Sequence, residues 1–196
     1  METYDAVRTV LAIREFKSDA LPEESVRKIV EAAHLTGSSM NAQPWHFIVV
    51  QRKDLLDQLG GLVSSGPYIA DSSLAVVVAT EKNSVYGISD ASRAIQSMIL
   101  TAWSVGIGSN WAGWVGMEAV GTLLNVPDSL QIVAVIPFGV PKDKRGGNQK
   151  NRKPINDIVH GEKFGEPLVM GCPAKFIIKL YFPGLGLLGN ELVAGI

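Results

Sequence analysis

Apolar residues recur in the first part of the chain at the spacing of helices. Residues 4–11 follow this spacing and predict a short first helix with Arg14 at its end. A second helix is predicted to start at Leu21–Glu24, because proline stands in the first turn and two acids lie near the positive end of the helix dipole. Gly37 is expected to end it. Its apolar face is formed by Val26, Ile29, Val30 and Ala33.

Further along the chain, continuous apolar runs alternate with helical patterns. The strongest helical pattern covers residues 91–105, with Gly106 as its stop, and shorter helices are predicted over 53–60 and 116–125. The apolar runs predict strands at Trp45–Val50, Leu74–Thr80 and Gln131–Pro137. The valine-rich second run indicates a strand that is buried on both faces. Helices and strands that interleave in this way favour an α/β or α+β sandwich, with helices that cover a mixed sheet.

Length and composition fit one globular domain. The chain has 196 residues, of which 46% are hydrophobic and 19% charged. Its net charge of −1 offers no general attraction to nucleic acid or to anionic membranes. One cysteine, Cys172, cannot form an intramolecular disulfide, and the acidic N-terminus does not resemble a signal peptide. No run of 18 apolar residues predicts a transmembrane helix, so we expect a cytoplasmic protein.

The apolar C-terminal segment stands apart from this pattern. We expect a main domain over residues 1–165 and an apolar extension over 166–196, which glycines and prolines interrupt too often for a membrane helix. Such a surface needs a cover, and packing on a partner subunit is one solution. Packing on the chain's own core, or disorder, are the alternatives. The polar segment Pro141–Pro154 is expected to be an exposed loop or arm.

Several common kinds of chemistry lack their motifs. The chain has no Gly-x-Ser-x-Gly nucleophile elbow and no Walker A motif. Gly106 and Gly108 follow a predicted helix rather than a strand, and residue 111 is tryptophan, which excludes a dinucleotide fingerprint. The three histidines are far apart in the sequence, so we expect no metal site.

Three segments remain as candidates for binding. Residues 37–45 place hydroxyl and amide side chains in a turn, where they can contact the edge of a planar heterocycle, although an ordinary helix-ending turn has the same composition. Residues 106–114 combine glycines, which let backbone amides approach a ligand, with two tryptophans that could cover a ring or simply fill the core. Arg14 and residues 150–153 are cationic and could bind phosphate, or form an ordinary solvated surface.

In this order, these segments resemble the nitroreductase family of flavoproteins. The resemblance covers residues 2–165 and rests on Ala12–Phe16, Ser38–Trp45, Gly106–Gly113, and Lys150–Pro154 with Val159-His160. It implies an α+β fold, an α/β/α sandwich with a mixed central sheet, and an intertwined homodimer that binds FMN at the subunit interface. It also implies ping-pong chemistry, in which NADH or NADPH reduces FMN and FMN reduces a small electron-poor acceptor such as a nitroaromatic or a quinone. The flavin carries the hydride, so no catalytic side chain is expected.

The resemblance also assigns roles to residues. Arg14 would contact the FMN phosphate or ribityl group, and Lys150 and Arg152 would contact the phosphate. The other subunit would provide hydrogen bonds to the flavin through Ser38, Ser39, Asn41 and Gln43. The ring near N5 would be lined, largely through backbone amides, by Asn110, Trp111, Ala112 and Gly113. The region of Asp90, Arg93 and Gln96 would approach the site.

One departure from the family pattern bears on cofactor binding. Where family members commonly carry Arg-Arg-Ser or Arg-x-Ser, this chain has Val10-Leu11-Ala12. The loss of a charge-assisted hydrogen bond weakens binding by about 1.5–3 kcal/mol per contact, and Arg8, near the same helix end, could compensate. Two alternatives stand beside a nitroreductase. One is a flavin dehydrogenase or dehalogenase of the same fold, which the sequence does not separate from it. The other is a non-enzymatic flavin or nucleotide binder or dimer scaffold, which Val10 and Leu11 favour.

Overall fold

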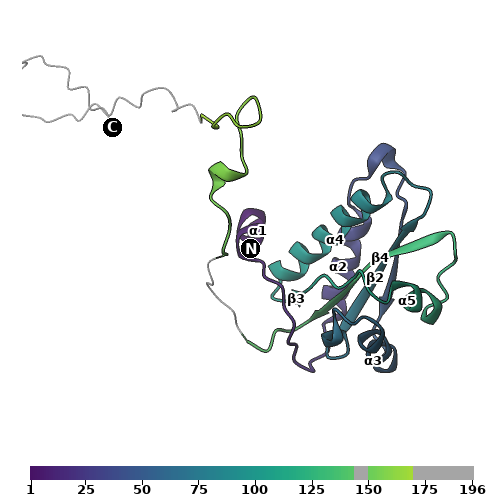
Figure 1. Cartoon of the computed structure of the whole chain (residues 1–196). Coiled ribbons are helices and arrows are strands. Elements are labelled where there is room, and N and C mark those ends of the chain that lie inside the picture. Colours follow the sequence, from purple (N-terminus) through teal and green to yellow (C-terminus); the bar gives the residue numbers. More distant parts are fainter. Residues whose placement is uncertain (144–149, 170–196) are drawn as a thin grey trace, which may run out of the picture. The chain divides into compact units, whose positions relative to one another are not determined.

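A computed structural model describes residues 1–143 and 150–169 of the chain (Figure 1). Contacts divide the chain into two compact units between Lys150 and Asn151. The apolar extension predicted for 166–196 lies outside the described residues from residue 170 onward, as do residues 144–149 of the predicted exposed arm. The domain boundary that the sequence suggests at residue 165 stays a prediction.

The first unit is built around a four-stranded sheet. Its strands have the spatial order β1-β2-β4-β3, with bounds of Trp45–Val50 for β1, Leu74–Glu81 for β2, Gly108–Ser109 for β3 and Leu130–Gly139 for β4. Every pair of neighbouring strands is antiparallel. Among the described residues, the sheet is mixed only through one parallel bridge, which joins Ala12 to Ser109. The three longer strands match the apolar runs of the sequence closely.

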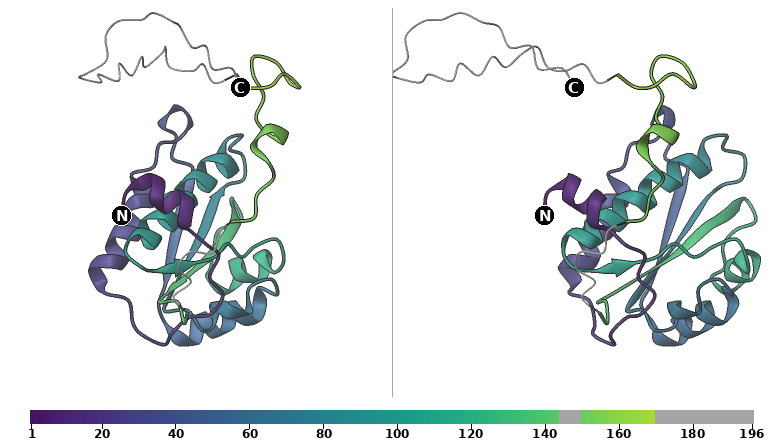
Figure 2. Two further views of the ribbon diagram at one scale, coloured as in Figure 1. Left: turned by 90° about the vertical axis from the view of Figure 1, so that its left-hand side faces the viewer. Right: turned by 60° about the vertical axis from the view of Figure 1, so that its left-hand side comes forward.

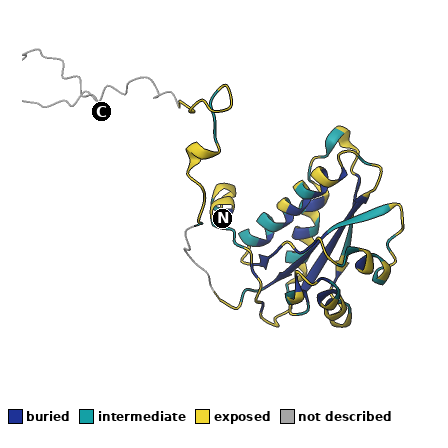
Figure 3. Ribbon diagram, in the orientation of Figure 1, coloured by how far each residue is buried: buried dark blue, intermediate teal, exposed yellow. Residues whose placement is uncertain are grey.

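Helices cover both faces of this sheet, which confirms the α+β sandwich (Figure 2). Val76 and Val78 of β2 belong to the core cluster under α2 and α4, whereas Ala75 and Val77 belong to the cluster under α3 and α5. The helices have bounds of Glu23–His34 for α2, Lys53–Leu62 for α3, Gly87–Ser104 for α4 and Met117–Leu123 for α5. Residues Leu74–Thr80 are fully buried, as the dark ribbon of β2 in Figure 3 shows.

Helix ends differ from the sequence expectations in three places. The first helix, α1 (Thr3–Thr9), ends well before Arg14, which instead lies in an extended connection. Helix α2 ends at His34 rather than at Gly37. Helix α4 begins at Gly87 instead of residue 91, so that Asp90 lies in its first turn, and it ends as expected before Gly106, whose φ is +82°.

The second unit is described from residue 151 to residue 169. It contains a 3-10 turn, Ile155–Asp157, and a short antiparallel bridge between His160 and Pro167. The amide of Gly161 donates to the carbonyl of Glu166 at 2.7 Å, and the ring of Phe164 lies 4.3 Å from that of His160. These contacts define a compact local turn.

The core under α3 provides a test of the packing. Leu59 is fully buried there, whereas Leu35 is 72% exposed after α2. We expect Leu59→Ala to lower the free energy of unfolding by about 2–5 kcal/mol, because it removes buried methyl groups and leaves a cavity. Leu35→Ala should change it by less than about 0.5 kcal/mol. Urea unfolding followed by circular dichroism measures both, and equal effects would contradict this assignment of the core.

Candidate functional site

The loop of residues 38–43 joins α2 to β1 and has an unusual backbone. Met40, Asn41 and Gln43 have positive φ angles of 52°, 55° and 51°. This left-handed conformation is unfavourable for L-residues by on the order of 1–2 kcal/mol each. It persists only where the surroundings enforce it, and such strained segments are concentrated at functional sites. The 38–43 loop therefore needs specific contacts to hold it.

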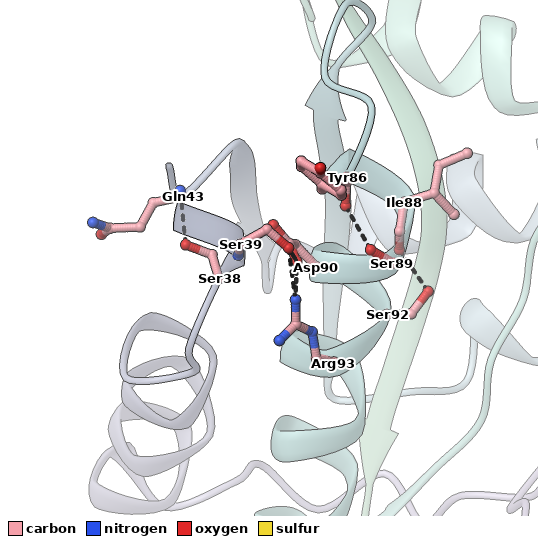
Figure 4. Close-up of polar contacts among 9 residues, drawn as sticks. All are labelled: Ser38, Ser39, Gln43, Tyr86, Ile88, Ser89, Asp90, Ser92 and Arg93. Atoms are coloured by element: carbon pink, nitrogen blue, oxygen red, sulfur yellow. Dashed lines mark hydrogen bonds and ion pairs between the residues drawn. The ribbon is translucent and has the colours of Figure 1, made fainter. Parts of the chain in front are cut away.

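Some of these contacts lie within the loop itself. The amide of Gln43 donates to the hydroxyl of Ser38 at 3.0 Å, and its side-chain amide reaches Oδ1 of Asn41 at 3.2 Å. Asn41 and Gln43 are exposed, and Ser38 is half-buried. Figure 4 shows the Gln43 side chain pointing away from α4. The loop thus presents an outward set of amide and hydroxyl groups, as the sequence predicts.

Other contacts attach the loop to α4 through a buried carboxylate. Asp90 accepts hydrogen bonds from the backbone N–H and the hydroxyl of Ser39, each at 3.0 Å, and it pairs with Arg93 (Figure 4). Burial raises the pKa of Asp90, whereas the bonds from Ser39 and Arg93 lower it, and the net effect holds this pKa below its usual value. The carboxylate is therefore ionised at neutral pH.

Arg14 belongs to a second group of predicted site residues, which lies beside β3. The amide of Ile13 donates to the carbonyl of Ser109 at 2.9 Å. A Cβ on Gly108 would come within 2.6 Å of Ile13, so only glycine lets this connection approach the strand. Arg14 is exposed and lines an open hollow of about 150 Å³, together with Glu15 and Asp143 among others. An exposed guanidinium at a hollow can bind a phosphate in a bidentate manner.

The segment after β3 is packed more tightly than the sequence suggests. Ala112 exchanges both backbone hydrogen bonds with Val135 of β4, at 3.0 and 2.8 Å, and is 1% exposed. Its amide is therefore engaged by β4, and the predicted place of Ala112 beside the flavin ring stays a prediction. Buried Asn110 donates to the hydroxyl of Tyr68, and the carbonyl of Gly113 accepts from Ser65 at 2.9 Å. Of the four predicted ring-lining residues, Trp111 is the exposed one.

The other cations are engaged in different ways. The ammonium group of Lys150 donates to the carbonyl of Val7 in α1 at 2.6 Å. Arg8 pairs with Asp5 at 3.3 Å in an exposed contact, which does not place it as a substitute for the missing family arginines. Arg152 lies in the second unit and donates to the carbonyl of Asn151 at 3.0 Å. Phosphate contacts by Lys150 and Arg152 stay predictions.

Helix α4 and the sheet separate the two groups of residues. Asp90, which holds the 38–43 loop, lies in the first turn of α4, whereas Ile107, just before β3, bonds to Ala102 at the other end. With a rise of 1.5 Å per residue, these ends are about 20 Å apart. The strand pairing agrees, because β1 begins opposite Thr80 and Ser109 pairs with Phe138 near Leu74. Within one chain, the 38–43 loop and Arg14 therefore lie at opposite ends of the sheet.

Sequence reasoning identified part of this arrangement. It placed the region of Asp90 and Arg93 near the site, and the structure brings both to the 38–43 loop, whereas Gln96 is an exposed residue farther along α4. Because the helix was expected to begin at residue 91, Asp90 was not recognised as an acid of its first turn. Tyr68, the partner of Asn110, was missed, and no local pattern marks it.

Comparison with known proteins identifies the family. Residues 8–81 and 68–140 match the nitroreductase family. A protein of Archaeoglobus fulgidus named "Putative NADH dehydrogenase/NAD(P)H nitroreductase" is 31% identical over 172 residues, which cover 83% of this chain and 99% of that protein. The chain therefore belongs to the nitroreductase family.

Two further proteins are similar to this chain. The structure of an FMN-dependent nitroreductase from Clostridium difficile R20291 has a TM-score of 0.74 and 26% identity, and the match covers 81% of this chain and 98% of that one. An iodotyrosine deiodinase of Thermotoga neapolitana is 23% identical over 181 residues, or 80% of this chain and 95% of that protein.

The described part of the chain was found to lack two other features, a cluster of metal-ligating side chains and a membrane-spanning helix. Within residues 1–143 and 150–169, no cluster of three or more histidine, cysteine, aspartate or glutamate side chains could hold a metal ion. No helix among the same residues has the length and apolar character needed to cross a membrane.

The lowered pKa of Asp90 gives the fold a specific pH dependence. Because the folded-state pKa lies below the value of 3.8 usual for aspartate, Asp90 stabilises the fold above that value and loses this effect as the pH falls through its folded-state pKa. The difference in unfolding free energy between the native chain and Asp90→Asn should therefore be largest near neutral pH and shrink below about pH 4. Urea unfolding at a series of pH values measures it, and parallel pH curves for the two proteins would contradict this role.

Proposed function

We propose that the protein is a cytoplasmic FMN-dependent oxidoreductase that uses NADH or NADPH, in a ping-pong cycle, to reduce a nitroaromatic, a quinone or a similar electron-poor acceptor. Membership of the nitroreductase family supports this, as do the names of the relatives from Archaeoglobus fulgidus and Clostridium difficile. FMN, when bound, accepts and donates the hydride. The chain then has to bind and orient FMN, the nicotinamide and the acceptor.

The donor groups on the chain fit such a cofactor. Ser38, Asn41 and Gln43 offer hydroxyl and amide groups on a braced loop, and these match the alternating donors and acceptors along the edge of a flavin ring. Arg14 offers an exposed guanidinium for the phosphate, at a hollow that the acidic Glu15 and Asp143 also line. Trp111 offers an exposed aromatic surface beside the ring. In this proposal Asn110 and Gly113 act through their contacts with Tyr68 and Ser65, which fix the segment that carries Trp111.

The placement of these groups carries a further part of the proposal, a homodimer. The end of α4 that holds the 38–43 loop and the end next to β3, beside which Arg14 lies, are about 20 Å apart by the rise of an α-helix. The family resemblance implies that the loop and the phosphate-binding arginine of one site come from different chains, and their placement at opposite ends of the sheet fits this arrangement. Two copies, each of which supplies the loop to the other's Arg14, would complete two equal sites. Lys150 and Arg152 are proposed to add charge at the phosphate.

The first test is the absorbance spectrum of the purified protein with added FMN, followed by anaerobic addition of NADH or NADPH. We expect bound flavin with its two visible bands, which bleach when the nicotinamide is added. An unbleached spectrum with firmly bound FMN would favour a non-enzymatic flavin binder. Failure to bind FMN at all would indicate that Val10-Leu11-Ala12 has removed too many contacts, and would overturn the proposal.

A second candidate function is reductive dehalogenation, which the similarity to the iodotyrosine deiodinase favours. We expect the reduced protein to be reoxidised faster by a nitroaromatic or a quinone than by iodotyrosine. Stopped-flow absorbance of the reduced flavin with each acceptor under anaerobic conditions measures these rates. Faster reoxidation by iodotyrosine, with release of iodide, would replace the first function by the second.

Mixed dimers test whether each site is shared between two chains. Arg14→Ala and Asn41→Ala homodimers should each lose FMN affinity, by about tenfold or more where Arg14 loses a charged hydrogen bond and by a smaller factor where Asn41 loses an uncharged one. A dimer with one chain of each kind would contain one doubly altered site and one unaltered site. We therefore expect it to bind FMN tightly at one site per dimer. If each site belonged to one chain, the mixed dimer would have no unaltered site, and titration of tagged, purified mixed dimers with FMN distinguishes the two cases.

A further inference from the structure

Asp90 is a buried charge that takes no direct part in the proposed chemistry. Within residues 1–143 and 150–169, it is the only charged side chain that is buried. A buried carboxylate is unfavourable unless hydrogen bonds and an opposite charge compensate for its lost hydration. Here Ser39 and Arg93 provide that compensation. Because Ser39 belongs to the 38–43 loop and Asp90 to α4, the buried carboxylate attaches this loop to the helix.

Both hydrogen bonds from Ser39 come from the residue just before the left-handed turn. Oδ2 of Asp90 accepts the backbone N–H of Ser39, and Oδ1 accepts its hydroxyl. Two bonds to neighbouring atoms fix the orientation of this residue as well as its position. Arg93 pairs with Oδ1 of Asp90 and also donates, at 3.2 Å, to the hydroxyl of Ser39. The three side chains form a closed set, which Figure 4 shows between the loop and α4.

We propose that Asp90, acting through Ser39 and Arg93, is the positioning residue that holds the 38–43 loop in its binding conformation before FMN arrives. This inference rests on the proposed function, in which Ser38, Asn41 and Gln43 contact the flavin. A loop that is already ordered loses less conformational freedom on binding and therefore binds more tightly. Asp90 itself does not touch the cofactor.

The hydrogen bonds divide the loop into an inward and an outward side. The Ser39 hydroxyl donates its one proton to Asp90, so it could meet a ligand only as an acceptor. The side chains of Asn41 and Gln43 remain exposed. The predicted role of Ser39 as a flavin contact is therefore replaced, in this proposal, by that of an anchor for its neighbours.

The chain contains a matched control for this arrangement. Glu24 and Arg27 in α2 are an acid and an arginine three residues apart, as are Asp90 and Arg93, but both are exposed and neither contacts the loop. Asp90→Asn keeps the shape of the side chain and removes its charge, and Glu24→Gln does the same at the control site. A general effect of a lost charge should appear in both variants.

Hydrogen exchange of the FMN-free protein tests whether Asp90 holds the loop. We expect the amides of residues 38–43 to exchange about tenfold faster or more in Asp90→Asn than in the native chain. This ratio corresponds to a tenfold shift of the loop's equilibrium from its closed to its open conformation. Amides of β2 should be unaffected, and Glu24→Gln should match the native chain throughout. Unchanged exchange of the loop in Asp90→Asn would overturn the proposal.

Fluorescence titration with FMN tests whether this order matters for binding. We expect the Kd for FMN to rise about tenfold or more in Asp90→Asn and to stay within about twofold in Glu24→Gln. Faster loop exchange with an unchanged Kd would overturn the positioning role. If the native chain binds no FMN, the proposed function fails, and this shows in the native titration rather than in the comparison of variants.

A pair of variants at Ser39 covers the case in which Asp90→Asn does not fold. Ser39→Ala removes the hydroxyl that donates to Asp90, and Ser39→Thr retains one. We expect Ser39→Ala to weaken FMN binding and Ser39→Thr to restore it, with similar thermal unfolding of both FMN-free proteins. Equal affinities of the two variants would overturn the proposal, because a role in packing alone does not depend on the hydroxyl.

Discussion

The burial of β2 on both faces is the constraint on which the rest of the structure depends. Its alternate side chains pack under α2 and α4 on one face and under α3 and α5 on the other. A strand without a solvent face fixes the order of the layers, because each neighbouring element must cover part of it. The 38–43 loop and the Arg14 connection are then confined to the ends and edges of the sheet. The candidate site is therefore at the periphery of a rigid core.

Polar groups at this periphery are held by contacts that differ in kind. Backbone pairing fixes the Arg14 side, where Ile13 bonds to Ser109 and Ala112 bonds to Val135. The 38–43 loop has no such strand partner and depends on a buried carboxylate instead. One side of the candidate site is thus an extension of the sheet. The other is a strained turn stabilised by charge, which makes it the more sensitive of the two to single substitutions.

The sequence predicted the elements that repeat a simple pattern and missed those that depend on tertiary contacts. The longer strands are continuous apolar runs, and burial in the centre of a sheet favours such runs, so their bounds were close to those observed. The first turn of α4 was missed because Gly87, Ser89 and Asp90 are not apolar, and its helical form depends on packing and on the bond network of Asp90. The left-handed turn carries no glycine to mark it. Likewise, the pairing of Ala112 with Val135 joins segments far apart in the sequence, which no local pattern reveals.

The length of α4 has a thermodynamic consequence for a site that two chains share. If the helix keeps the loop of each chain away from its own Arg14, cofactor binding and subunit association become linked equilibria. Each ligand then strengthens the other, so that FMN favours the dimer as much as the dimer favours FMN. The fraction of protein that carries cofactor would depend on protein concentration as well as on the supply of FMN. A helix of 18 residues would in this way couple the activity of the protein to its abundance.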